Sequence, residues 1–271
     1  MIIVDYRLKQ EQIRMLENTM NKIFICFAAE DRYAAAEPIV YHMKNYGFPI
    51  WYDRTELLMG DNRINKNLIE GAGQSKYVIA VISKNSATSE CFMEELEIVR
   101  KRYYKSEVTV FPVIYEISPQ KLPNNLQWIC ELIFKEISIS SGTREVCNHV
   151  ACKITNDLLA DYKQKDLKSI VAYCNIPTLI KRFIETYLSI DNENINARIS
   201  ILYALNLTLQ SIYIDDSISN NYVNLVSRIF TRLFDETRLS IKIDYRELWL
   251  LENAICLLIN IYLESLTDSR I

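Results

Sequence analysis

Hydrophobic and polar positions follow two different periods in the first part of the chain. Short apolar runs, rich in β-branched and aromatic side chains and bounded by turn residues, predict buried β-strands. Between them, apolar residues recur every three or four positions, as in amphipathic helices. The expected strands are residues 22–27, 48–53, 77–83 and 108–117, with a short edge strand at 132–137. The expected helices are residues 31–46, 62–74, 88–104 and 142–161.

From about residue 165 onward, the pattern changes to helix after helix. Apolar residues recur at three and four, as in Leu179, Phe183 and Tyr187, and this spacing predicts a helical bundle. The expected helices lie at 167–174, 178–190, 195–214, 221–237 and 245–266. Strand–helix alternation before this point predicts a parallel sheet covered by helices on both faces.

Glycine and proline mark the same division of the chain. All five glycines lie within the first 142 residues, and only Pro177 among the six prolines lies beyond residue 123. Since both residues mark turns, the first part must turn often and the second seldom. We therefore expect an N-terminal extension at 1–20, carrying a short amphipathic helix, an α/β domain at 21–162 and an all-helical domain at 163–271.

Charge and composition exclude several classes of function. The formal net charge of −3 gives no general attraction to nucleic acid or to anionic lipid, so neither is an expected partner. No apolar run approaches the roughly 18 residues that cross a bilayer, and the first residues do not resemble a signal peptide. Seven scattered cysteines without a CxxC pair and two histidines favour reduced thiols in a cytoplasmic protein without a metal site.

Five motifs, in order, resemble those of the Toll/interleukin-1 receptor (TIR) domain family. The resemblance covers about residues 21–160, and nothing comparable is found for residues 165–271. The motifs are KIFICFAAEDRY, YGFPIWYD, ELLMGDNRINKNLIEGAGQSKYVIAVIS, SKNSATSECFMEEL and FPVIYEISPQKLPNNLQWI. The fold that this resemblance implies is flavodoxin-like, a five-stranded parallel sheet with helices on both faces. Ligands of such sheets bind beyond the carboxyl ends of the strands.

Two adjacent glutamates near the start of the expected helix 88–104 have different surroundings. At about 100° per residue, Phe92, Leu96 and Val99 form a stripe that should face the sheet. Glu94 then points to solvent, whereas Glu95 lies on the flank of the buried stripe. Glu95 is the glutamate that can reach the edge of the sheet where ligands bind.

The TIR resemblance singles out the same residue. The alignment of SECFMEEL with the family pattern places Glu95 at the glutamate that is catalytic in TIR domains that hydrolyse NAD+. The resemblance therefore implies an NAD+ glycohydrolase, or a cyclase, in which NAD+ is a substrate and no separate cofactor is needed. A glutamate in the first turn of a helix is also favoured by the helix dipole alone, and it occurs in TIR domains without enzymatic activity.

Further residues are expected around the NAD+ from the same resemblance. They are Phe27, Ala28, Trp51, Asp53, Leu57, Asn62 and Cys91. Several depart from the family pattern: Ala28 stands where the axon-degeneration member has arginine, Cys91 replaces a tryptophan, and Asn62 stands near a position that is often aromatic. Phe27 and Trp51 offer stacking surface, although Trp51 also suits a strand residue packed under helices. Asp53 also suits a bracing role at the loop that follows the second strand.

Two functions of different classes follow. The first is an NAD+-consuming enzyme that acts on assembly, similar to bacterial anti-phage TIR effectors and centred on Glu95. Its expected partners are other copies of the chain, bound through the TIR domain or the helical domain, and an activating protein or nucleotide signal. The helical domain would sense the trigger, hold the enzyme inactive or drive assembly. The alternative is a non-enzymatic adaptor that acts through contacts between TIR domains.

Overall fold

The computed structural model describes residues 22–213, 226–233, 235, 243 and 245–268. The expected N-terminal helix and much of the expected helix 221–237 lie outside these residues. Internal contacts divide the chain into two units, with the division after Cys147. The short segment Asn45–Gly47 groups with the second unit.

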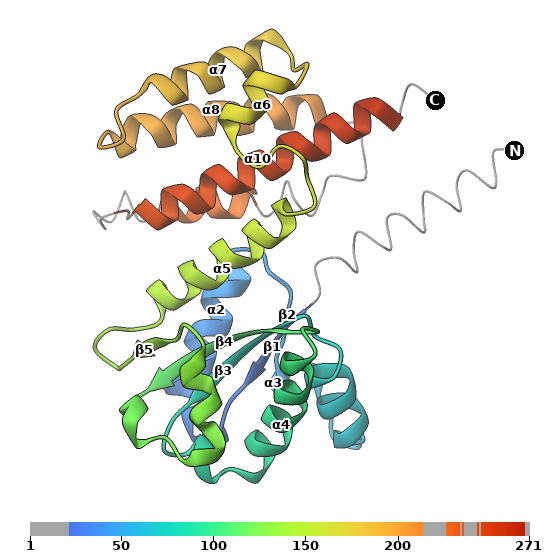
Figure 1. Ribbon diagram of the computed structural model, residues 1–271, viewed down its shortest axis with the longest axis vertical. Helices are drawn as coiled ribbons and strands as arrows, with labels where there is room; N and C mark the ends of the chain where they lie inside the picture. The colour runs from blue at the N-terminus through green and yellow to red at the C-terminus, as the bar shows by residue number, and fades with distance from the viewer. Residues whose placement is uncertain (1–21, 214–225, 234, 236–242, 244, 269–271) are drawn as a thin grey trace, which may run out of the picture. The chain divides into compact units, whose positions relative to one another are not determined.

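The first unit is built on a parallel sheet with the strand order β2-β1-β3-β4-β5 (Figure 1). Its strands are β1 (Ile23–Cys26), β2 (Ile50–Trp51), β3 (Tyr77–Ile82), β4 (Thr109–Tyr115) and β5 (Lys135–Ile137). Every strand pair is parallel, with Cys26 opposite Ala80 at the carboxyl end of β1. This confirms the expected flavodoxin-like sheet, including β5 as a short strand at its edge.

The helices of this unit lie on both faces of the sheet, with α2 and α4 on opposite sides (Figure 1). They comprise α2 (Glu37–Asn45), α3 (Asp53–Glu56) and α4 (Glu90–Tyr104), together with the first residues of α5 (Arg144–Leu159). Shorter 3₁₀ segments are η1 (Ala29–Asp31), η4 (Ser86–Thr88), η5 (Pro119–Lys121) and η6 (Asn124–Glu131), and η2 (Arg32–Ala36) and η3 (Ile64–Ala72) are π-helical. The expected helices 31–46 and 62–74 are therefore present, but not as uniform α-helices.

The second strand is much shorter than the expected run 48–53. Only Ile50 and Trp51 pair with β1, and Asp53 already begins the short helix α3. β2 lies at the edge of the sheet, and a short edge strand leaves few unpaired backbone groups for another chain to bind.

Helix α4 begins and ends where its sequence directs. The Ser89 side chain accepts a hydrogen bond from the Phe92 N–H at 3.4 Å, which satisfies one of the free donors of the first turn. Near its other end, the Arg102 guanidinium donates to the carbonyl oxygens of Ala72 and Ser75 at 2.7 Å each. These contacts join the end of α4 to the segment that runs from the end of η3 to β3.

The core between α4, η3 and the sheet contains two of the three tryptophans. Trp51 packs against Phe24, with 5.1 Å between ring centroids, and Trp128 packs against Tyr103 at 5.6 Å. Both tryptophans are buried. Gly71 lies against the first of these pairs, since a Cβ atom there would come within 2.7 Å of Phe24 Cε2.

Among the described residues of the second unit, the regular elements are all helices. It contains α6 (Leu167–Tyr173), α7 (Thr178–Ser189), α8 (Ile195–Tyr213) and α10 (Tyr245–Asp268), and residues 226–233 are also helical. Helix α8 packs against both α7 and α10, which confirms the expected bundle. Trp249 on α10 is 39% exposed.

A buried polar chain explains why Asn45–Gly47 groups with the helical unit. The Tyr46 hydroxyl donates to Asn148 Oδ1, and Asn148 Nδ2 donates to Glu247 Oε1 at 2.9 Å. The expected boundary at 162/163 would place Asn148 in the α/β domain, whereas the contacts divide the chain after Cys147. Because Asn148 lies in α5, this helix contributes to both units.

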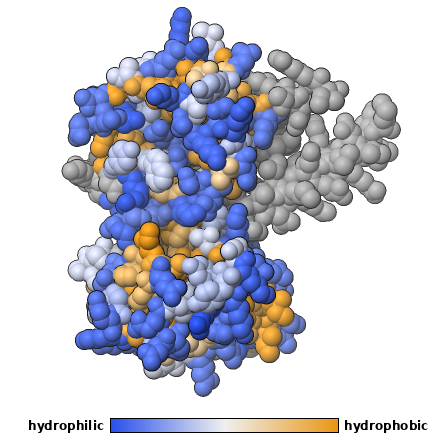
Figure 2. Space-filling view, in the orientation of Figure 1, coloured by the Kyte–Doolittle hydropathy of each residue, from blue (hydrophilic) through white to orange (hydrophobic). Residues whose placement is uncertain are grey.

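The visible surface of the described residues is mainly hydrophilic, with scattered hydrophobic patches (Figure 2). Among the described helices, none is both long enough and apolar enough to span a bilayer. In the first unit, several large apolar side chains on the segment after β2 and on η3 are exposed, namely Leu58, Met59, Ile64 and Ile69. A cytoplasmic location stays a prediction.

Candidate active site around Glu95

The two adjacent glutamates of α4 lie in different environments, as the helical pattern predicts. Glu95 is only 7% exposed, and it lies beside the buried stripe of Phe92, Leu96 and Val99. Glu94 is exposed, and its carboxylate accepts a hydrogen bond from Arg63. Glu95 is therefore the one of the two whose carboxylate is removed from water.

Two neighbouring elements hold the Glu95 carboxylate. Asn67, from the middle of η3, donates a hydrogen bond from Nδ2 to Glu95 Oε1. The Cys26 thiol, at the carboxyl end of β1, is a second hydrogen-bond partner of this carboxylate and also lies 3.8 Å from the Phe92 carbonyl oxygen. Glu95 is thus held at the point where β1, η3 and α4 meet.

Burial and its partners set the ionisation of Glu95. Burial raises its pKa from 4.5 to about 7, while the hydrogen bonds from Cys26 and Asn67 act in the opposite direction. The negative charge of Asp53 also raises the pKa of Glu95, and the positive charge of Arg63 lowers it. Burial raises the pKa of the Cys26 thiol well above its ordinary value of 9.0, so this donor stays neutral. Near neutral pH, Glu95 is therefore present both with and without its proton.

A second carboxylate, that of Asp53, lies near Glu95, just after the carboxyl end of β2. Arg32 donates to both carboxylate oxygens of Asp53 at 2.8 Å each, and to the Tyr52 hydroxyl at 3.0 Å. Its guanidinium also lies over the Phe27 ring, 5.0 Å from the centroid, and over the Tyr52 ring at 5.6 Å. A planar guanidinium can make both kinds of contact at once. Asp53 is thereby fixed at the start of α3.

Arg32→Lys is expected to destabilise the protein by about 1 kcal/mol, because an ammonium group cannot make the two-pronged contact and stack on the rings as well. Denaturant unfolding measures this effect. Arg54→Lys is the matched control, since Arg54 pairs with Glu37 at the surface and exposed pairs contribute little. Equal losses in the two variants would contradict the role given to Arg32.

The residues expected around NAD+ fall into three groups. Phe27, Ala28 and Trp51 are buried, and Trp51 packs in the core below α4. Leu57 is partly buried against the same core, and Asp53 is held by Arg32. Asn62 and Cys91 are exposed, and Asn62 Oδ1 accepts a hydrogen bond from the Asn65 N–H at 3.1 Å. Their contacts with a substrate stay predictions.

Three residues of this region were not expected from the sequence as site residues. Cys26 lies in the expected strand 22–27, Arg32 in the expected helix 31–46 and Asn67 in the expected helix 62–74. A weak signal for Asn67 was available, because it lies four residues before Gly71 and therefore on the same helical face. Gly71 is buried, and so is Asn67.

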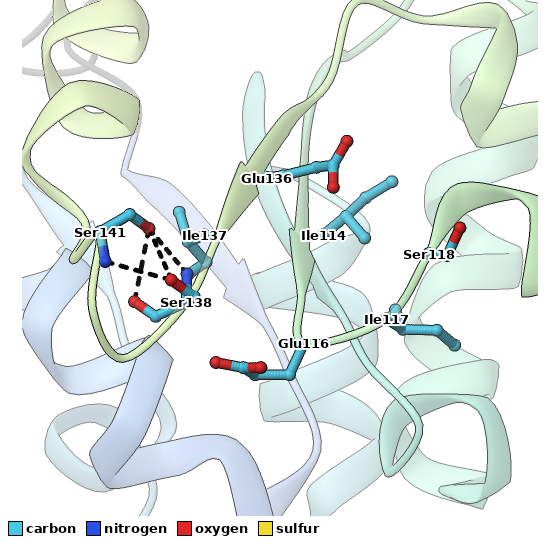
Figure 3. A pocket seen from close by; sticks show the side chains of 8 residues that line it. All are labelled: Ile114, Glu116, Ile117, Ser118, Glu136, Ile137, Ser138 and Ser141. Atoms are coloured by element: carbon cyan, nitrogen blue, oxygen red, sulfur yellow. Dashed lines mark hydrogen bonds between the residues drawn. The ribbon is translucent and has the colours of Figure 1, made fainter.

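A hollow of about 410 Å³ lies elsewhere at the same edge of the sheet (Figure 3). It lies between the carboxyl ends of β4 and β5, with Glu116 and Glu136 among its lining residues. Glu116 Oε1 accepts a hydrogen bond from the Ile139 N–H at 3.1 Å. The lining residues do not include Glu95, Asn67 or Cys26, so this hollow and the Glu95 site are distinct. Over the described ranges, no group of three or more acidic, histidine or cysteine side chains is arranged to hold a metal ion.

The fold and the position of Glu95 define an α/β domain of the flavodoxin-like class with a buried carboxylate near the carboxyl ends of its strands. Residues 23–132 match the family described as TIR domain. This part of the chain is a TIR domain.

The relatives of this chain include proteins named as NAD(+) hydrolases and as a cyclic ADP-D-ribose synthase. NAD(+) hydrolase TcpC of Escherichia coli O6:H1 is 23% identical over 147 residues, which cover 54% of this chain and 47% of the relative. NAD(+) hydrolase TcpA of a Theionarchaea archaeon is 27% identical over 100 residues, with 37% and 30% covered. The 2′ cyclic ADP-D-ribose synthase BtTIR of Bacteroides thetaiotaomicron is 26% identical over 99 residues, with 36% and 34% covered. The match thus spans less than half the length of each of these relatives.

Proposed function

We propose that this protein cleaves the bond between nicotinamide and ribose in NAD+, with Glu95 as the catalytic residue. The observation that carries the proposal is the buried Glu95 carboxylate, held by Asn67 and Cys26 and ionised in part near neutral pH. Perturbed carboxylates of this kind are typical of catalytic sites. Two relatives are named NAD(+) hydrolases, which supports the same substrate.

The chemistry asked of Glu95 is electrostatic. When the bond between the ribose C1′ and the nicotinamide nitrogen breaks, the bonding electrons leave with the ring and neutralise its positive charge. The ribose then carries positive charge, as in glycoside hydrolysis, and an ionised carboxylate nearby stabilises it. Water adding at C1′ loses a proton to solvent and gives ADP-ribose. A hydroxyl or adenine nitrogen of the same molecule adding there would give a cyclic product.

Nicotinamide release from NAD+, followed by chromatography, tests the proposal. We expect release by the wild type at high protein concentration and its loss in Glu95→Ala. Glu97→Ala is the matched control, because Glu97 is exposed on the same helix and pairs with Lys101 and Arg100 at 3.6 and 3.9 Å. Because the ionised form of Glu95 is required, the rate should rise between pH 6 and pH 8. Release that survives in Glu95→Ala would overturn the proposal, and the co-product separates hydrolase from cyclase.

A second candidate function is an adaptor that works by contact between TIR domains. The exposed apolar side chains Leu58, Met59 and Ile64 favour it, because apolar residues gathered at a surface suit contact with another protein. The Glu95→Ala variant separates the two functions. Loss of function with unchanged assembly supports the enzyme, whereas unchanged function supports the adaptor.

A further inference from the structure

Asn67 is a buried polar residue whose contacts are incomplete. Its side chain is 6% exposed, and Nδ2 donates to Glu95 Oε1. Within the described part of the chain, Oδ1 is buried and has no hydrogen-bond partner. Asn67 thus makes one strong contact, to an ionisable group, and leaves its second polar atom unsatisfied.

This arrangement counts against a packing role for Asn67. A buried acceptor without a partner loses its hydration and gains nothing in return, whereas an apolar side chain of similar shape avoids that cost. An apolar side chain at position 67, which lies between Ile64 and Gly71 on η3, would therefore stabilise the protein more than asparagine does. The role of the Asn67 amide is therefore the hydrogen bond that it donates to Glu95.

We propose that Asn67 is the positioning residue of the site, which holds the Glu95 carboxylate in place for reaction through the hydrogen bond from Nδ2 to Oε1. This inference rests on the proposed function. With Oε1 bound, rotation of the carboxylate group is restricted, and its other oxygen keeps one direction. Pre-organised groups of this kind do not have to reorient when charge develops on the substrate.

The same hydrogen bond opposes the effect of burial on Glu95. A donor favours the ionised carboxylate, so Asn67 lowers the pKa of Glu95, as the Cys26 thiol also does. The charges that act on Glu95 come from other elements: Asp53 on α3, and Arg63 just before η3. On α4 itself, Glu94 pairs with Arg63. None of these charged groups is changed when Asn67 is replaced.

Asn67→Leu and Asn67→Asp test the proposal, with Asn65→Leu as the control on the exposed side of the same segment. We expect Asn67→Leu to lower nicotinamide release at pH 7 by at least about tenfold, and to shift the midpoint of the rise in rate with pH upward by about one unit, because a donor to an ionised group is lost. Asn67→Asp should shift the midpoint further, since two adjacent carboxylates resist ionising together. Asn65→Leu should keep the wild-type rate and midpoint.

A merely structural role for Asn67 gives a different result. In that case Asn67→Leu would lower stability and leave the midpoint of the pH profile unchanged, and this outcome overturns the proposal. We expect the thermal stability of Asn67→Leu to equal or exceed that of the wild type at acidic pH, where Glu95 is protonated, because an unsatisfied buried acceptor is removed. An unchanged rate in Asn67→Leu would also overturn the proposal.

A measurement without NAD+ separates this proposal from the proposed function. The stability difference between Glu95→Gln and its parent, followed from pH 5 to pH 9, reports the ionisation of Glu95 in the folded protein. If the wild type releases no nicotinamide, the proposed function fails. The interaction between Asn67 and Glu95 is then tested by the pH midpoint of this stability difference in the Asn67→Leu background. A higher midpoint supports the interaction, and an unchanged midpoint overturns it.

Discussion

At pH 8, Glu95→Gln is expected to raise the free energy of unfolding by about 3 kcal/mol relative to the wild type. This value is the shift in the pKa of Glu95 on folding, expressed as a free energy, about 3 kcal/mol. At pH 5 the two proteins should differ by less than about 1 kcal/mol on the same relation. The substitution keeps the shape of the side chain and the acceptor for Asn67 Nδ2. The introduced amide can also donate to Asn67 Oδ1, which has no partner among the described residues. The same variant should release no nicotinamide.

The sign follows from the direction of the pKa shift. The pKa of Glu95 is raised from 4.5 to about 7 in the folded protein, so the folded state binds a proton more tightly than the unfolded chain. Below pH 4.5, Glu95 is protonated in both states and its ionisation costs nothing. Between pH 4.5 and 7, the wild type loses stability as the pH rises. In this range Glu95 is ionised in the unfolded chain, and folding must either return its proton or bury its charge away from water. Above pH 7 the loss is complete.

Denaturant unfolding at a series of pH values measures this difference. Glu97→Gln is the control, because Glu97 is exposed on the same helix and its replacement should give a small difference with little pH dependence. A Glu95→Gln variant that is less stable than the wild type at pH 8 would contradict a raised pKa for Glu95. Stability gained by removing a charge at the cost of activity is typical of catalytic groups held away from water.

Gly71→Ala should destabilise the protein by about 2 kcal/mol, although alanine is the better helix former, because overpacking a filled core costs more than the gain in propensity. A Cβ atom at Gly71 would lie 2.7 Å from Phe24 Cε2 and 3.2 Å from Trp51 Cε2. Both rings are buried and packed on each other, so neither can move without disturbing the sheet. The midpoint of denaturant unfolding, with its slope, is the measurement.

The origin of this loss can be checked with a second substitution. Phe24→Leu makes room beside Gly71, so the double variant Phe24→Leu/Gly71→Ala should lose less stability than the two single losses together. Gly60→Ala separates crowding from backbone strain, since Gly60 has a φ of +100° and no atom within 4 Å of a Cβ atom there. If the losses at Gly71 and Phe24 simply add, crowding is not the cause.

The sequence predicts most of the fold because its patterns are local. Each strand is a short apolar run between turn residues, and the resemblance of five motifs fixes their order in a sheet. The rotation of α4, and with it the burial of Glu95 and the exposure of Glu94, follows from helical periodicity alone. The length of β2 does not follow, because the run 48–53 is as apolar as a longer strand. In the structure Asp53 already belongs to α3, where Arg32 holds it from a distant segment of the chain.

The hydrophobic pattern does not predict the hydrogen-bond partners of Glu95, for a similar reason. Asn67 is polar and lies in an amphipathic segment, and the only sign of its burial in the sequence is its place on the same helical face as Gly71. Its hydrogen-bond partner, Glu95, lies 28 residues further along the chain. Cys26 likewise has two roles that look the same in the sequence, as a small core residue and as a donor to a carboxylate. Only the packing of β1, η3 and α4 against one another distinguishes them.

The placement of the three tryptophans gives the chain its own set of fluorescent reporters. Trp51 lies next to Gly71 at the β2 side of the sheet, Trp128 lies under Tyr103 near the end of α4, and Trp249 lies on α10 of the helical unit. The two buried indoles should emit at shorter wavelength than the partly exposed Trp249. Variants that keep one tryptophan each would therefore show whether the TIR domain and the helical unit unfold in one step or in two.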